Sequence, residues 1–161
     1  MKTRIGFGYD VHAFAKERDL WLGGIRIEHT EGLLGHSDAD VLIHAICDAL
    51  LGAANLRDIG FHFPDTSDEN KNIDSKILLY KTMELIRNYG YELGNIDATI
   101  AAEQPKLNPY IPTMQETLAK VMQVEKNDIS IKATTSEKLG FVGRKEGIAA
   151  YATVLIQGKE K

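Results

Sequence analysis

The feature that most constrains the fold is an almost wholly apolar stretch over residues 36–52, HSDADVLIHAICDALLG. From Asp38 onward it has helical spacing with almost no polar side, and a helix that is apolar all round is normally buried. Asp40, His44 and Asp48 nevertheless recur every four residues, so they share one face of that helix. Buried groups of this kind must be paired, hydrogen-bonded or bound to a metal. This face is therefore a first candidate for chemistry.

Strand and helix patterns alternate around this helix. Strands are predicted over residues 4–12, 93–102, 129–135 and 148–156, and a hairpin around two glycines over residues 21–27. Further helices are predicted over residues 73–89 and 112–122, and a long irregular loop over residues 55–72. This order predicts an α+β fold: a two-layer α/β sandwich, with a mixed β-sheet and helices packed on one face, formed by residues 1–161 as a single domain.

Composition excludes several function classes. The chain has 19 basic and 23 acidic residues and no basic cluster, which argues against a nucleic-acid surface. No stretch approaches the roughly 20 apolar residues of a membrane span, and the first residues lack the apolar part of a signal peptide. Cys47 is the single cysteine and lies in the apolar stretch, so no disulfide framework is expected. We therefore expect a cytoplasmic protein that binds neither nucleic acid nor membranes.

Three residues are candidates for a metal site. Asp10 and His12 are two apart on a predicted strand, so their side chains point to the same face. With His44 they supply two nitrogens and one oxygen, the kind of set that leaves a catalytic zinc an open position. The same set also binds non-haem iron. The alternative is structural: an ordinary pair at a strand end and a core histidine with its hydrogen bonds satisfied.

A second candidate site lies near the C-terminus. Thr134, Thr135, Ser136 and Glu137 follow an apolar strand, so hydroxyl groups and backbone amides gather at a strand end, where anion-binding nests are common. The alternative is a solvated turn between two strands. The glycine pair at residues 6–8 lacks the third glycine of a dinucleotide-binding motif.

Several motifs together resemble one known family. They are GFGYDVH at 6–12, GHSDADVLIHAICDALLGAANLRDIG at 35–60, FPDT at 63–66, PK at 105–106 and KATTSEKLGFVGRKEGIA at 132–149. In the same order along nearly the full chain, they resemble the 2-C-methyl-D-erythritol 2,4-cyclodiphosphate synthases. The resemblance implies a phosphorus-oxygen lyase of non-mevalonate isoprenoid biosynthesis. In its reaction the 2-phosphate of 4-diphosphocytidyl-2-C-methyl-D-erythritol 2-phosphate attacks its own β-phosphorus, closes the cyclic diphosphate and releases CMP. It also implies a homotrimer with active sites between subunits.

The resemblance assigns roles residue by residue. It assigns Zn²⁺ to Asp10, His12 and His44, and a second divalent cation, Mg²⁺ or Mn²⁺, to Glu137. It assigns phosphate positioning and transition-state stabilisation to His36 and Thr135. The residues matched to contacts with methylerythritol phosphate are Ser37, Asp58, Ile59, Gly60, Phe63, Pro64, Asp65, Thr66 and Ser67. Those matched to the cytidine pocket and its surroundings are Ala102, Glu103, Gln104, Pro105, Lys106, Leu107, Asn108, Thr134 and Ser136.

Two further expectations follow. In this family, positions matching Phe141 and Arg144 line a central cavity on the trimer axis, where isoprenoid diphosphates are proposed to bind. Asp40 and Asp48 have no matching role, and we expect one of them to hydrogen-bond His44 and fix its tautomer. Two other function classes stay open: a non-catalytic, metal-dependent anion-binding module and an iron oxygenase.

Overall fold

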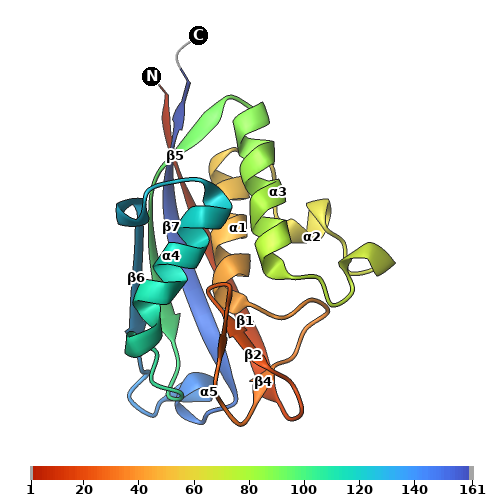
Figure 1. Cartoon of the computed structure of the whole chain (residues 1–161), viewed down its shortest axis with the longest axis vertical. Helices are drawn as coiled ribbons and strands as arrows, with labels where there is room; N and C mark the ends of the chain where they lie inside the picture. Colours follow the sequence, from red (N-terminus) through yellow and green to blue (C-terminus); the bar gives the residue numbers. More distant parts are fainter. Residues whose placement is uncertain (1, 160–161) are drawn as a thin grey trace.

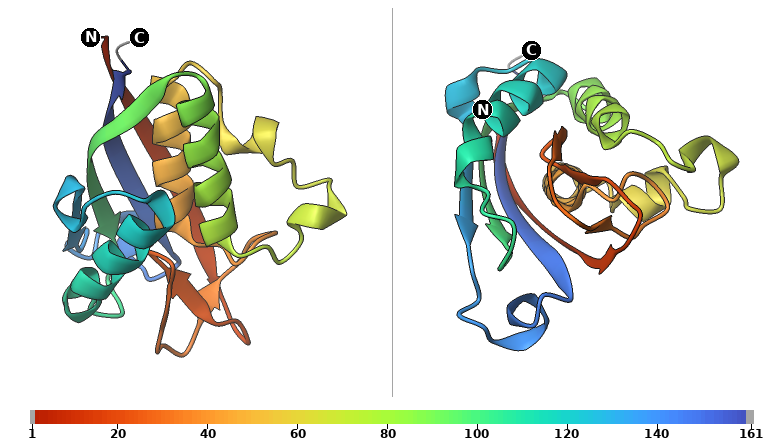
Figure 2. Two further views of the ribbon diagram at one scale, coloured as in Figure 1. Left: turned by 45° about the horizontal axis from the view of Figure 1, so that its top comes forward. Right: turned by 60° about the horizontal axis from the view of Figure 1, so that its bottom comes forward.

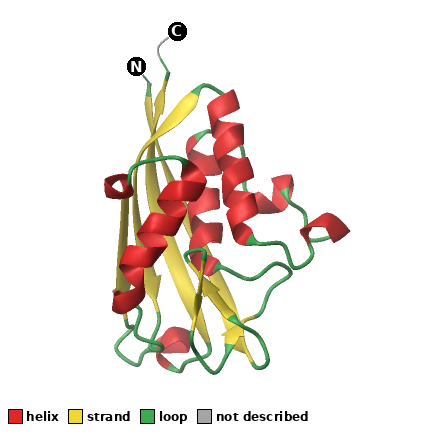
Figure 3. Cartoon of the chain, viewed as in Figure 1, coloured by secondary structure: helices red, strands yellow, loops and turns green. Residues whose placement is uncertain are grey.

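The computed structural model describes residues 2–159. Its largest element is a five-stranded sheet with the order β4-β1-β7-β5-β6 (Figures 1 and 3). The strands are β1 Thr3–Ala15, β4 Gly32–Leu33, β5 Tyr91–Ala101, β6 Ile129–Thr134 and β7 Gly147–Gly158. β5 and β6 are parallel, whereas the other neighbours are antiparallel. The α+β prediction with a mixed sheet is confirmed, and the four predicted sheet strands all form.

Three long helices cover one face of the sheet (Figure 2). They are α1 Val41–Ala53, α3 Ser75–Asn88 and α4 Ile111–Met122. α1 lies against β1 and β7 and is covered on its far side by α3. It is buried along almost its whole length, as predicted from its apolar sequence.

The structure also contains shorter helices that the hydrophobic periodicity of the sequence did not predict. They are α2 Ile59–His62, α5 Gly140–Gly143, and the 3₁₀ helices η1 Asp68–Asn70, η2 Asn108–Tyr110 and η3 Lys126–Asp128. The prediction of an irregular stretch over residues 55–72 is therefore wrong in part. Asp58 starts α2 by accepting a hydrogen bond from the Phe61 amide at 3.0 Å. A helix of one turn carries no repeat that a sequence pattern can reveal.

The predicted hairpin is formed by β2 Leu20–Leu22 and β3 Ile25–Ile27. Gly23 and Gly24 join them with φ of +63° and +78°, as a two-residue turn of this kind requires. The buried Asp40 carboxylate accepts hydrogen bonds from both glycine amides, at 3.0 and 2.7 Å, and from the Ile43 amide at 3.1 Å. Asp40 is thus the N-cap of α1 and fixes the hairpin to the start of this helix.

The glycine pair in β1 sets the distance between the sheet and α1. A Cβ atom on Gly6 would lie 1.9 Å from the carbonyl oxygen of Ala49, and one on Gly8 would lie 1.9 Å from that of Ala45. β1 and α1 therefore touch backbone to backbone. Cys47 lies in the same core, and burial raises the pKa of its thiol to about 12, in keeping with a core residue.

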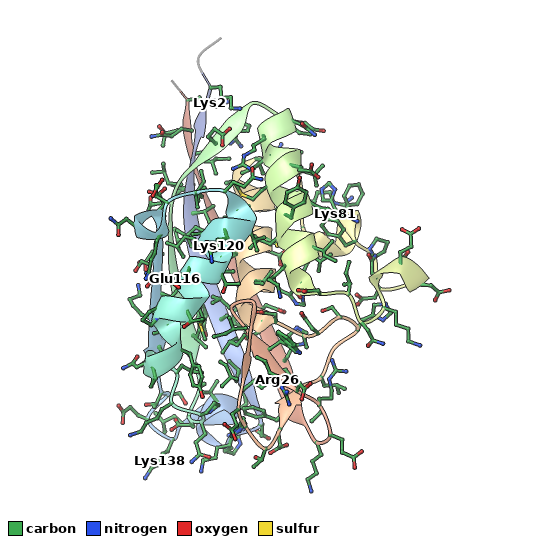
Figure 4. All side chains as sticks on the ribbon, in the orientation of Figure 1. Lys2, Arg26, Lys81, Glu116, Lys120 and Lys138 are labelled. Atoms are coloured by element: carbon green, nitrogen blue, oxygen red, sulfur yellow. The ribbon has the colours of Figure 1, made fainter. Side chains whose placement is uncertain are left out.

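The outer faces of the helices and the uncovered face of β1 differ in polarity. Charged side chains cover the outer faces of the helices, including the labelled Lys81 on α3 and Lys120 on α4 (Figure 4). The opposite face of β1 is apolar and exposed, with Ile5 at 74% and Phe7 at 65% exposure. No helix in residues 2–159 is long and apolar enough to cross a membrane.

Candidate metal centre and ligand pockets

The predicted ligand cluster is assembled by the close contact of β1 and α1. Asp10 and His12 follow Gly6 and Gly8 on the inner face of β1, and His44 precedes the Ala45 carbonyl that packs on Gly8. The Asp10 Oδ2 atom lies 2.9 Å from His12 Nε2 and 3.1 Å from His44 Nδ1. The two histidine nitrogens are 3.2 Å apart. The structure therefore brings the three residues together as a possible metal site.

Orientation of the His12 ring supports this interpretation. His12 Nδ1 lies 2.8 Å from the Leu34 carbonyl oxygen. Because a carbonyl only accepts, Nδ1 carries the proton of the neutral ring and Nε2 turns its lone pair into the cluster. A tetrahedral zinc with Zn–N distances of about 2.0–2.1 Å would separate its ligand atoms by about 3.3 Å. The separations within the cluster fit that value.

Without a cation, the cluster must hold protons instead. Burial alone would raise the pKa of Asp10, but hydrogen bonds from His12 and His44 outweigh burial and lower this pKa to about 2. Burial works against the charged form of His12 as well, yet the hydrogen bond to the Asp10 carboxylate raises the pKa of His12. The site thus keeps a carboxylate anion that attracts positive charge, whether a proton or a metal ion.

The expectation that Asp40 or Asp48 hydrogen-bonds His44 is wrong. Asp40 turns back to cap α1, and Asp48 accepts a hydrogen bond from the Ile59 amide at 2.9 Å. His44 Nε2 lies instead 3.2 Å from Ser37 Oγ and 3.0 Å from Ser75 Oγ. The i, i+4 spacing places residues on one face of a helix, but it does not determine which loops their side chains meet.

The cluster opens into a pocket of about 200 Å³, the metal pocket. Its lining residues are Asp10, His12, His36, Ser37, His44, Ile59, Gly60, Phe63, Asp65, Asn70, Ile73 and Leu78. His36 Nε2 is buried there without a hydrogen-bond partner among the described residues, so its hydrogen-bonding capacity is unsatisfied. The residues of the predicted methylerythritol phosphate site that lie outside this lining are Asp58, Pro64, Thr66 and Ser67. Sequence reasoning missed Asn70, Ile73 and Leu78.

The predicted cytidine residues line a second pocket, of about 460 Å³, the nucleotide pocket. Its lining residues are Ala102, Glu103, Pro105, Lys106, Leu107, Asn108, Pro109, Ala133, Thr134 and Thr135. The Glu103 carboxylate also accepts hydrogen bonds from the amides of Ser136 and Lys138, at 3.2 and 3.1 Å. It therefore holds the turn that follows β6. Two of the predicted residues, Gln104 and Ser136, are not part of the lining of this pocket.

The two pockets are distant from each other within one chain. They share no lining residue. β1 and β6 are separated by β7 and β5, and strand spacing of about 4.8 Å places them about 14 Å apart. Thr135 belongs to the nucleotide pocket, and Glu137 is exposed and lines neither pocket. The structure thus does not bring these two predicted residues to the predicted metal ligands of the same chain.

Comparison with known proteins places the chain in a family. Residues 3–157 match the model of the YgbB family. The chain belongs to this family. The 2-C-methyl-D-erythritol 2,4-cyclodiphosphate synthase of Parabacteroides distasonis is 78% identical over 157 residues, which cover 98% of each chain.

Solved structures agree with this YgbB assignment. The bifunctional IspDF from Campylobacter jejuni is 44% identical with a TM-score of 0.95, and the match covers 99% of this chain and 43% of that one. IspF from Plasmodium falciparum, solved as a CDP complex, is 35% identical with a TM-score of 0.86, and the match covers 98% of this chain and 97% of that one.

Two predicted residues of this YgbB chain lie apart from both pockets. Phe141 and Arg144 lie on and directly after α5, and both are exposed. The Arg144 Nη2 atom is 3.0 Å from Glu146 Oε2. An anion bound at Arg144 would therefore compete with a neighbouring carboxylate.

Proposed function

We propose that the chain cyclises 4-diphosphocytidyl-2-C-methyl-D-erythritol 2-phosphate to 2-C-methyl-D-erythritol 2,4-cyclodiphosphate with release of CMP, a lyase reaction of non-mevalonate isoprenoid biosynthesis. The observation that carries this proposal is the convergence of Asp10, His12 and His44 in a chain 78% identical to a synthase of that name. The iron-oxygenase and binding-module alternatives have no comparable support from the relatives.

The two cations are assigned to different residues. Asp10, His12 and His44 would hold Zn²⁺, because their donor set and separations fit that ion. Glu137 would hold a second divalent cation, Mg²⁺ or Mn²⁺, because it matches the family position for that ion; its carboxylate is exposed, two residues after Thr135 of the nucleotide pocket. When bound, such ions polarise phosphoryl oxygens and offset the charge that spreads over them.

The side chains around the metal pocket would bend and orient the substrate. The attacking phosphate and its target belong to one molecule, so most of the catalytic effect is expected from positioning. His36 Nε2 is buried without a protein partner and would donate to a phosphate oxygen, and Ser37 would contact the same group. The phosphate monoester is largely ionised near neutral pH, so no strong base is needed.

The nucleotide pocket would hold the cytidine. It is the larger of the two pockets, and it is lined by the predicted residues at the end of β5 and β6. The relative from Plasmodium falciparum was solved as a CDP complex, which supports a nucleotide site in this fold. Thr135, in the lining of this pocket, would reach the α-phosphate, which leaves with CMP, and the β-phosphate, which stays in the cyclic product.

An assay for released CMP tests this function. The purified chain is incubated with Zn²⁺, Mg²⁺ and the diphosphocytidyl substrate, and both products are followed by phosphorus NMR. We expect CMP and the cyclic diphosphate in equal amounts, and the loss of both after the metals are removed with a chelator. Binding of the nucleotide without turnover would instead identify a non-catalytic module.

A homotrimer with active sites between subunits is part of the proposal. Separate metal and nucleotide pockets need a neighbouring chain to bring them together, and the sheet offers a face for such a neighbour. The large apolar side chains exposed on the uncovered face of β1 and β7 are Ile5, Phe7, Tyr9, Val11 and Tyr151. A contiguous apolar patch of this kind is typical of a protein interface, and closed symmetry allows three copies to share it.

We expect replacement of Phe7 with aspartate to give monomers and to stop CMP release. The change places a charge in the apolar face, which would have to be desolvated on assembly. Analytical ultracentrifugation measures the mass. The matched control is replacement of Ile77 with aspartate, because Ile77 is 45% exposed but lies on α3. The control should remain a trimer; a Phe7 variant with the mass and activity of the wild type would refute the interface.

Isoprenoid diphosphate would bind on the trimer axis near Phe141 and Arg144, in competition with Glu146 for the Arg144 guanidinium.

Residues 1–161 would form a single domain, which the family match over residues 3–157 supports. A cytoplasmic location is supported by Cys47, the single cysteine of the chain, which is a buried free thiol.

A further inference from the structure

A serine and an aspartate from distant segments lie behind the His44 ring. Ser75 is the first residue of α3 and is fully buried. Its hydroxyl oxygen lies 3.0 Å from His44 Nε2, the ring nitrogen that faces away from the ligand cluster. The Ser75 hydroxyl donates a short hydrogen bond to Asp38 Oδ1, and its backbone amide donates to Asp38 Oδ2 at 2.9 Å. Asp38, Ser75 and His44 therefore form one continuous chain of hydrogen bonds.

The direction of these hydrogen bonds determines where the proton of His44 lies. A carboxylate can only accept, and a serine hydroxyl has a single proton. Since that proton is donated to Asp38, the Ser75 oxygen can only accept from His44. Nε2 must then carry the proton of the neutral ring, which leaves the lone pair of Nδ1 directed at Asp10 and His12.

Neighbouring hydrogen-bond donors keep the Asp38 carboxylate an acceptor. Its Oδ1 atom also accepts from the Asp40 amide at 3.1 Å, so three donors converge on this carboxylate. It lies at the first turn of α3, where the helix dipole stabilises negative charge. Ser37 does not determine a direction by itself, because its hydroxyl proton is free to point toward or away from Nε2 at 3.2 Å.

We infer that Ser75, oriented by Asp38, is a positioning residue that fixes the His44 tautomer and thereby prepares Nδ1 to bind the metal. This inference rests on the proposed metal site. A partner of this kind on a ligating histidine typically changes metal affinity by about 10- to 100-fold.

Zinc affinity and proton exchange of the ring test the inference. In Ser75→Ala we expect the zinc dissociation constant, measured by chelator competition, to rise at least about tenfold. In the zinc-loaded wild type, the Nε2 proton of His44 should give a protected proton NMR signal. In Ser75→Ala this signal should shift and exchange faster with water. Asp38→Asn should also weaken zinc binding, because its NH₂ group would face the Ser75 hydroxyl or a backbone N–H.

The control separates this role from helix stability. Asp74 caps α3 by accepting from the Lys76 amide at 2.9 Å. Asp74→Ala therefore weakens the same helix start, and it should keep wild-type zinc affinity and the protected signal. Wild-type affinity and an unchanged signal in Ser75→Ala would overturn the inference, as would equal losses in Asp74→Ala. Failure of the wild type to bind zinc would instead overturn the metal site itself.

Discussion

Replacing His12 with alanine is expected to abolish zinc binding and CMP release together. His12 supplies one of the two nitrogens of the cluster, and its ring is held by the Leu34 carbonyl at 2.8 Å. With one ligand lost, Asp10 and His44 retain too few donors for a stable zinc site. Removing electrostatic stabilisation of this kind costs at least about 10²- to 10³-fold in rate. Zinc content is measured by atomic emission, and CMP release by the product assay.

Replacing His29 with alanine is the matched control for this experiment. His29 is a partly exposed histidine that packs against Phe14 and lines neither the metal pocket nor the nucleotide pocket. The variant should keep one zinc per chain and the wild-type rate of CMP release. Full activity in zinc-free His12 variant protein would show that the cluster is not the metal site of this reaction.

Most long elements of this fold could be predicted from local patterns. The predicted strand over residues 129–135 differs from β6 Ile129–Thr134 by one residue, because alternating apolar side chains mark a half-buried strand. The helix over residues 112–122 likewise matches α4 Ile111–Met122. The cluster itself was predictable because Asp10 and His12 share a strand face, and because His44 is out of place in an apolar helix.

Features set by long-range packing could not be predicted. His44 and Ser75 are 31 residues apart in the chain, and no local spacing indicates that they meet. Asp40 and Asp48 were predicted to lie beside His44 because all three share one face of the helix, and helical spacing does not indicate contacts with distant segments. The family resemblance implies active sites between subunits, but no local pattern shows that Thr135 and the predicted metal ligands of one chain are apart. That separation follows from the strand order, in which β7 and β5 come between β1 and β6.

Replacing Gly8 with alanine is expected to cause a large loss of stability. The new Cβ would lie 1.9 Å from the Ala45 carbonyl oxygen and 2.8 Å from the Ala49 amide nitrogen, so the backbone of α1 must move away. Forcing atoms into a packed core costs about 1–3 kcal/mol, occasionally more. Since both clashing groups are backbone atoms, we expect a loss of about 3 kcal/mol in the free energy of unfolding. Urea denaturation at fixed protomer concentration measures it.

The same substitution at Gly52 should have the opposite effect. Gly52 lies in α1 as well, but a Cβ atom there would meet nothing within 4 Å. Alanine is favoured over glycine inside a helix by about 1 kcal/mol, so the Gly52 variant should gain stability and bind zinc as the wild type does. The Gly8 variant should also bind zinc more weakly, because moving α1 carries His44 away from Asp10 and His12. Normal stability in the Gly8 variant would mean that the glycines of β1 do not set the spacing on which the metal cluster depends.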